Sequence, residues 1–120
     1  MKLYYGYAAK GDNMDTKLTV TDASFDAAFE KYKKAEMVMF FATWCPHCHR
    51  MIPAADKLAK DYKGKAAVLA VDVDQSPDSS RKFGVSGVPT FVFVKDGKVQ
   101  ETISGEYPEE ELRKKLNALL

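Results

Sequence analysis

The segment MVMFFATWCPHCH, residues 37–49, brings together the two patterns that decide the fold. Its first half, Met37 to Ala42, is apolar throughout, as expected for a strand buried on both faces of a sheet that helices cover. Its second half holds a proline between two cysteines, and apolar residues at helical spacing follow it. These residues are Met51, Ala55, Leu58 and Tyr62. The segment therefore predicts a buried strand that leads into a helix opened by the cysteine pair.

Cys45 and Cys48 admit two chemical interpretations. Together with His49 they form CxxCH, the attachment signature of a c-type haem, whereas CxxC alone is the signature of a redox dithiol. At a helix N-terminus, unpaired backbone N–H groups and the helix dipole favour a thiolate. In the dithiol interpretation Cys45 is therefore the nucleophile, and Cys48, about one turn further on, is the more enclosed resolving thiol. Pro46 has no N–H to leave unsatisfied at this point, and its fixed φ stiffens the turn.

The residues before the cysteines predict a strand and a helix. Lys17 to Thr21 alternates in polarity and is expected to form a short strand, after which Asp22 or Ser24 suits the N-cap of an amphipathic helix. The apolar face of that helix comprises Phe25, Ala28, Phe29 and Tyr32. Further upstream, the Tyr-rich segment from Leu3 to Ala8 is a candidate edge strand.

The residues after the cysteines continue the alternation of strands and helices. Strands are predicted at residues 66–73, 90–94 and 98–104. Asp96-Gly97 suits the hairpin turn between the last two, and Asp74 or Ser76 suits the N-cap of a short helix that reaches Phe83.

A last helix is predicted with Pro108 at its first position and three glutamates at its positive end. Its apolar stripe comprises Leu112, Leu116 and Leu119. Helices that alternate with strands until a closing hairpin indicate an α/β fold with a mixed sheet.

Composition narrows the class of protein. A chain of 120 residues is expected to form one compact unit. Its charge is nearly balanced, with 18 Lys and Arg and 17 Asp and Glu, whereas a nucleic-acid-binding protein is usually strongly basic. No apolar run approaches the ~20 residues of a membrane-spanning helix. Because the N-terminus shows no secretory signal, we expect a cytoplasmic location, with a periplasmic location as the alternative. We also expect the protein to be a monomer.

Several separated features of the chain resemble the thioredoxin family. They are Phe40 to Cys45, Pro53 within the helix, Val71 to Pro77, Phe83 to Thr90, Lys95 to Lys98, and Gly105. The resemblance covers residues 17–120 and implies a thioredoxin-like domain, a central mixed sheet flanked by helices. Residues 1–16 then form an N-terminal extension outside the match.

The resemblance also implies a set of site residues. Pro89 corresponds to a cis-proline beside the dithiol, and the backbone of Val88 would pair with an extended segment of a substrate protein. Gly105 and Trp44 are the other substrate-binding residues that the resemblance implies. Trp44 would border the thiol as a partly exposed ring. No cofactor or metal is implied beyond the redox-active Cys45–Cys48 disulfide. The implied partners are disulfide-containing proteins and a thioredoxin reductase or another dithiol electron donor.

Two departures from the family pattern concern the chemistry of the dithiol, and the second concerns the direction of electron flow. Met39 and Ala70 stand where typical thioredoxins carry a buried Asp and a Lys, so the expected proton acceptor for Cys48 is missing. Pro46-His47 replaces the usual Gly-Pro and resembles the dipeptide of DsbA-type oxidants. We expect His47 to tune the redox poise, and we prefer a reductase to the alternative, an oxidant or isomerase.

Three further interpretations fit less well. A c-type haem protein disagrees with the buried strand before Cys45 and with the Val88-Pro89-Thr90 signature. A zinc site needs four ligands, and only the two cysteines and a nearby histidine are on offer. A non-catalytic interaction module would not need the intact dithiol.

Overall fold

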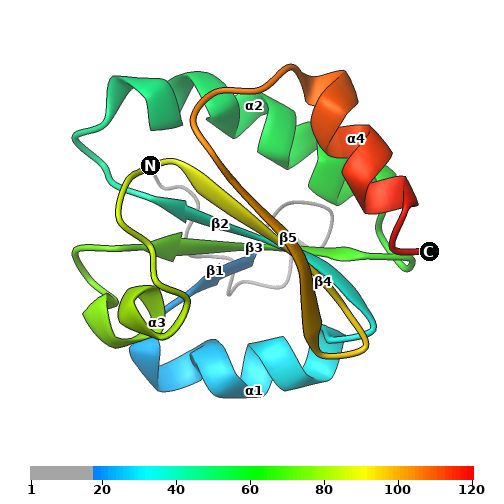
Figure 1. Ribbon diagram of the computed structural model, residues 1–120, viewed down its shortest axis with the longest axis horizontal. Helices are drawn as coiled ribbons and strands as arrows, with labels where there is room; N and C mark the ends of the chain where they lie inside the picture. Colours follow the sequence, from blue (N-terminus) through cyan, green and yellow to red (C-terminus); the bar gives the residue numbers. More distant parts are fainter. Residues whose placement is uncertain (1–17) are drawn as a thin grey trace.

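The computed structural model of the protein describes residues 18–120 and shows a five-stranded sheet between two layers of helices (Figure 1). The strands are β1 (Leu18–Val20), β2 (Ala35–Phe41), β3 (Ala67–Asp72), β4 (Thr90–Lys95) and β5 (Lys98–Ser104). The helices are α1 (Asp22–Tyr32), α2 (Pro46–Asp61), α3 (Pro77–Lys82) and α4 (Glu109–Asn117). The candidate strand at Leu3 to Ala8 and the extension at 1–16 lie outside the described residues.

The sheet is mixed, as the alternation of elements predicts. Its order is β1-β3-β2-β4-β5, in which β1, β3 and β2 run parallel and β4 and β5 run antiparallel to their neighbours. The helices α2 and α4 cover one face, and α1 and α3 cover the other (Figure 1). Closing the sheet with a hairpin is possible because Asp96 and Gly97 both adopt positive φ, 52° and 80°, as the tight turn requires.

The central strand β2 is buried along its whole length, which confirms the apolar run as a two-faced strand. Alternate side chains enter different cores: Met37 and Met39 pack in the core under α2 and α4, and Val38 and Phe40 pack in the core under α1 and α3. The same strand thus joins both halves of the hydrophobic core and carries the chain directly to the cysteines.

The predicted N-cap of α1 is wrong by one residue. Thr21 occupies the N-cap in extended conformation, and its backbone N–H donates to Ser24 Oγ at 3.0 Å. Asp22 is instead the first residue of the helix. The reciprocal Thr-Ser pair satisfies the backbone at the helix start, which leaves the carboxylate of Asp22 available for another element.

That other element is α3. The Asp22 carboxylate accepts hydrogen bonds from the backbone N–H groups of Asp78 and Ser79, at 3.1 and 2.8 Å, and from the Ser79 hydroxyl at 2.7 Å. Ser76 stands at the N-cap position, as one of the two predicted candidates, but its hydroxyl makes no capping hydrogen bond. A residue from α1 therefore caps α3, which local sequence patterns do not reveal.

The start of α4 also differs from prediction. Pro108 is the N-cap and not the first helical residue, because its ψ of 146° is extended. The helix begins at Glu109, and its predicted apolar stripe is buried in the core under α2 and α4. That stripe comprises Leu112, Leu116 and Leu119.

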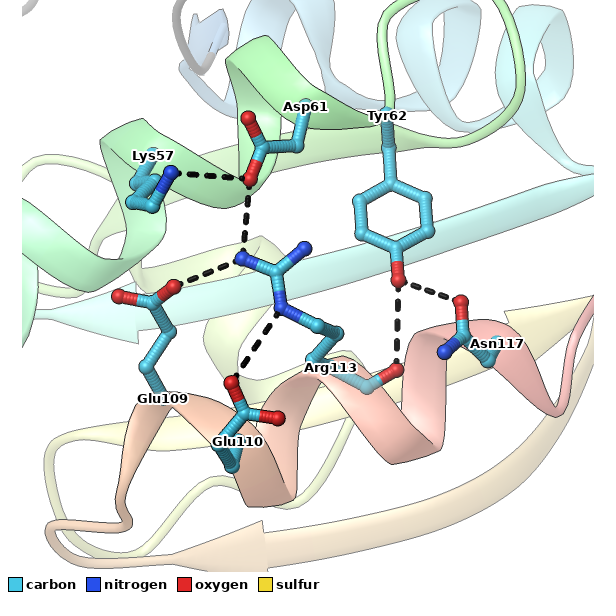
Figure 2. A network of polar contacts seen from close by, with 7 residues as sticks. All are labelled: Lys57, Asp61, Tyr62, Glu109, Glu110, Arg113 and Asn117. Carbon is cyan, nitrogen blue, oxygen red and sulfur yellow. Dashed lines mark hydrogen bonds and ion pairs between the residues drawn. The ribbon is translucent and has the colours of Figure 1, made fainter.

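A polar network fixes α4 against the C-terminal end of α2 (Figure 2). The Arg113 guanidinium pairs with Asp61 at 2.9 Å and with Glu109 at 2.7 Å. The Tyr62 hydroxyl donates to Asn117 Oδ1 and lies 3.5 Å from the Arg113 carbonyl oxygen. These contacts anchor the end of α2 that lies farthest from the cysteines.

Candidate active site

Three segments of the chain meet at one edge of the sheet. β2 ends at Phe41, and its residue Phe40 lies opposite Thr90 at the start of β4. Thr90 in turn lies opposite Ser104 at the end of β5. The cysteine helix, the loop before β4 and the loop after β5 are therefore brought together by the register of the sheet.

Cys45 occupies the N-cap of α2, where its sulfur accepts a hydrogen bond from the backbone N–H of Cys48 at 3.1 Å. An N-cap side chain ordinarily accepts such a bond through oxygen. Here the reactive sulfur takes that position, so the helix start presents an N–H donor and the positive end of the helix dipole to it. The prediction that the cysteine pair opens a helix is confirmed.

The two cysteines are free thiols in different environments. Both are nearly inaccessible, with 3% of Cys45 and 1% of Cys48 exposed. Burial, followed by the hydrogen bond with Cys45, raises the pKa of Cys48 to about 12. Cys48 therefore keeps its proton in the dithiol form, which suits a thiol that reacts second.

The loop before β4 lies against the dithiol. The Val88–Pro89 bond is cis, as the resemblance predicts, and the Val88 carbonyl oxygen lies 3.8 Å from the Cys45 sulfur. The backbone N–H of Gly105 donates to the Pro89 carbonyl at 2.8 Å. Gly105 has a φ of 101°, a conformation that side chains disfavour. Gly105 thus ties the loop after β5 to the cis-proline loop.

A groove of about 340 Å³ runs in front of Cys45. Trp44, 67% exposed, forms one border, and its Nε1–H donates to Asp74 Oδ2 at 2.7 Å. Pro46 and Val88 line the groove, together with residues of the segment 83–88. An exposed aromatic ring beside a mostly apolar groove provides a surface for an extended polypeptide.

His47 lies in a charged cluster that the sequence analysis missed. Its Nδ1 contacts Glu106 Oε2, and Arg50 Nε donates to the same carboxylate oxygen at 2.8 Å. These contacts hold the pKa of Glu106 below its usual range, with Arg50 the larger cause. Glu106 follows His47 by 59 residues, so no local pattern connects them. The only signal in the sequence was that Glu106 directly follows Gly105.

Met39 and Ala70 are direct neighbours in the sheet. They face each other in the register of β2 and β3, and both are fully buried in the core that contains Cys48. A lone Asp or a lone Lys at this pair of positions would be a buried charge without a partner. The pairing explains why an apolar residue at one position accompanies an apolar residue at the other.

The haem and zinc interpretations of the cysteine pair have little support in the geometry. His49, the histidine of the CxxCH pattern, uses its Nε2 for a hydrogen bond to the Thr43 carbonyl at 2.6 Å. Within residues 18–120 there is no group of three or more His, Cys, Asp or Glu side chains placed to hold a metal ion. The helices of the same residues include none long and apolar enough to cross a membrane.

Comparison with known proteins decides the family. The family model "Thioredoxin" matches residues 16–118. The chain belongs to the thioredoxin family. Thioredoxins of Staphylococcus aureus strains MW2 and N315 are each 40% identical to it over 98 residues, which cover 82% of this chain and 92% of theirs. Among solved structures, a mutant thioredoxin from Halobacterium salinarum NRC-1 matches with a TM-score of 0.79 and 29% identity, over 88% of this chain and 91% of that chain.

These findings confirm the predicted fold and activity. The chain has the thioredoxin fold, and it is a thiol–disulfide oxidoreductase. Thioredoxins act on disulfides of substrate proteins through their own two cysteines. The c-type haem protein and the oxidant or isomerase are not favoured.

Proposed function

We propose that the protein is a protein disulfide reductase in which Cys45 attacks and Cys48 resolves. The observation that supports these roles best is the asymmetry of the two thiols. The Cys45 sulfur lies at the helix start beside the groove and accepts an N–H hydrogen bond, whereas burial raises the pKa of Cys48 to about 12.

The reaction has two exchange steps. The Cys45 thiolate attacks one sulfur of a substrate disulfide, which forms a mixed disulfide and releases the other substrate sulfur as a thiolate that takes up a proton. Cys48 then loses its proton and attacks the Cys45 sulfur. This step forms the Cys45–Cys48 disulfide and releases the second substrate thiol. Two electrons pass to the substrate, and a thioredoxin reductase or another dithiol donor returns them.

The substrate would lie along the groove as an extended segment. In this proposal, the backbone of Val88 pairs with the substrate, and Trp44 covers one side of it. Pro89 and Gly105 keep the two loops at the distance that the segment needs. Pro46 and His47 act on the reactivity of Cys45. No cofactor is required, because the two cysteines carry the electrons.

A cytoplasmic monomer is the proposed working form, since a reductase depends on a reducing compartment. The charge near the dithiol bears on the alternative, an oxidant, which the comparisons do not favour. The Arg50 guanidinium interacts electrostatically with Cys45, and positive charge stabilises a thiolate and so the reduced protein. The reduction potential distinguishes the two, because a reductase needs a value near or below that of cytosolic glutathione.

Trapping the mixed disulfide tests the roles of the cysteines. Cys48→Ser should accumulate a covalent complex with a disulfide-containing protein such as insulin, since nothing remains to resolve it. Cys45→Ser is the matched control and should trap none. The complexes are measured on non-reducing gels and by intact mass. If only Cys45→Ser traps substrate, the assignment of the two roles is reversed.

A further inference from the structure

Glu106 stands out among the residues around the dithiol because it connects the loop after β5 to the cysteine helix α2. It follows Gly105 after β5, yet its side chain reaches the first turns of α2. One oxygen, Oε2, accepts from Arg50 and contacts Nδ1 of His47. Three charged or titratable side chains thus meet at one atom beside the groove.

The contacts of His47 cannot all be satisfied at once. Its Nδ1 lies 2.9 Å from an Arg50 guanidinium nitrogen, which can only donate, and also contacts the Glu106 carboxylate, which can only accept. An Nδ1 that carries a proton donates to Glu106, and an Nδ1 without one accepts from Arg50. In either form one of the two charged partners holds the ring, so the cluster fixes His47 at the start of α2.

The cluster acts on the reactive sulfur through its charge. Arg50 lies near enough to Cys45 for the two to interact electrostatically, and His47 lines the same groove as Cys45. On its own, the Arg50 charge would stabilise the Cys45 thiolate and make the couple more oxidising. The Glu106 carboxylate pairs with Arg50 and offsets its charge.

We propose that Glu106 is a positioning residue for disulfide exchange: it holds His47 and Arg50 at the start of α2 and neutralises the Arg50 charge beside Cys45. The Cys45–Cys48 couple is consequently less oxidising than Pro46-His47 alone would make it. This inference rests on the proposed function as a reductase, because it explains how an oxidant-like dipeptide is kept compatible with that direction of electron flow.

Glu106→Gln tests the charge, since it keeps the size of the side chain. The equilibrium between the protein and a glutathione redox buffer is measured by alkylation of the free thiols and intact mass. Glu106→Gln should shift the equilibrium constant toward the reduced protein by about two- to fivefold, the range that exposed charge pairs support. Glu101→Gln is the matched control. It also removes one carboxylate from an ion pair, but that pair joins Glu101 of β5 to Lys115 of α4. No shift, or a shift toward the disulfide, overturns the proposal.

Glu106→Asp tests the positioning. It keeps the negative charge but is one methylene shorter, so the contacts with Arg50 and His47 are lost together. Positioning predicts a shift in the same direction as Glu106→Gln. A Glu106→Asp protein with the wild-type equilibrium shows that charge alone suffices and overturns the positioning role.

Different measurements contradict the role of Glu106 and the proposed reductase function. The glutathione equilibrium reports on the Cys45–Cys48 couple whichever way electrons flow, whereas insulin reduction by the wild-type protein reports on the reductase. Active wild-type protein with an unshifted Glu106→Gln variant overturns only the role of Glu106. Wild-type protein that fails to reduce insulin, with a shifted Glu106→Gln variant, overturns only the reductase.

Discussion

Glu36 is a buried carboxylic acid near the start of β2. It lies on β2 between Ala67 of β3 and Val94 of β4, is fully buried, and has no hydrogen-bond partner for either oxygen among residues 18–120. Burial, with a smaller contribution from Glu30, raises its pKa to about 8. Near neutral pH the side chain is therefore mostly protonated and uncharged, which is the less costly form in this environment.

This buried acid makes stability depend on pH. The folded pKa of about 8 exceeds the ordinary value of 4.5, so between these values the folded state binds more protons than the unfolded state. The free energy of unfolding should then decrease as pH rises from about 5 to 8, by a few kcal/mol in all. Glu36→Leu should remove that slope and be the more stable protein at pH 8. Urea unfolding at several pH values measures both proteins, and parallel curves would mean that Glu36 has a partner.

Met39 offers a test of how Cys48 loses its proton. Met39→Asp places a carboxylate in the core that contains Cys48, at the position where typical thioredoxins have one. The carboxylate should accept the Cys48 proton, so the resolving step should accelerate near neutral pH while stability decreases. Met39→Asn is the control, because it is polar and of similar size but cannot take up the proton. Stopped-flow reduction across pH compares them, and identical profiles for Asp and Asn would exclude proton transfer at this position.

At the scale of helices and strands, local sequence patterns predicted the positions of the elements better than the contacts that cap their ends. The apolar run before Cys45, the turn at Asp96-Gly97 and the leucine stripe of α4 all depend on neighbouring residues, and all were confirmed. The cap of α3 was not predictable in this way, because its carboxylate comes from Asp22, 56 residues before Asp78. Pro108 was placed one position too far into its helix, since proline suits both N-cap and first position.

The same distinction holds for the site. The cysteine pair follows from spacing, and the cis-proline loop and Gly105 from the family resemblance. Arg50 and Glu106 were missed because they are exposed, charged and far apart in sequence, features that ordinary surface residues share. Only the register of β2, β4 and β5 brings them together.

The contact between α2 and α4 gives a prediction at this scale. Tyr62 is buried at the end of α2, and its hydroxyl bonds to Asn117 of α4 (Figure 2). Tyr62→Phe removes that bond and leaves the Asn117 oxygen without it, so the protein should lose about 1 kcal/mol of unfolding free energy. Tyr32→Phe is the control, because the Tyr32 hydroxyl makes no hydrogen bond within residues 18–120. If both variants lose the same unfolding free energy in chemical denaturation, the hydrogen bond between Tyr62 and Asn117 adds no stability.

At the scale of the whole molecule, the two helical layers have different roles around the same sheet. The layer of α2 and α4 carries the dithiol and is fixed at its far end by Arg113 and Tyr62. The layer of α1 and α3 leads into the segment 83–88, part of which lines the groove. The dithiol therefore lies on one layer, and part of the groove that we propose to bind the substrate is supplied by the other.

The hydrogen bonds from α3 to Asp22 have a consequence for cooperativity. A helix of six residues does not persist alone in water, and α3 owes part of its cap to the first residue of α1. Local unfolding of α1 would remove that cap from α3. We therefore expect the two helices to unfold and refold together, as one cooperative unit. The side of the proposed substrate groove that this layer supplies would unfold with them, while the dithiol remains on a helix that is still folded. Partial unfolding would therefore weaken the proposed substrate binding before it removes the helix that holds the reactive thiol.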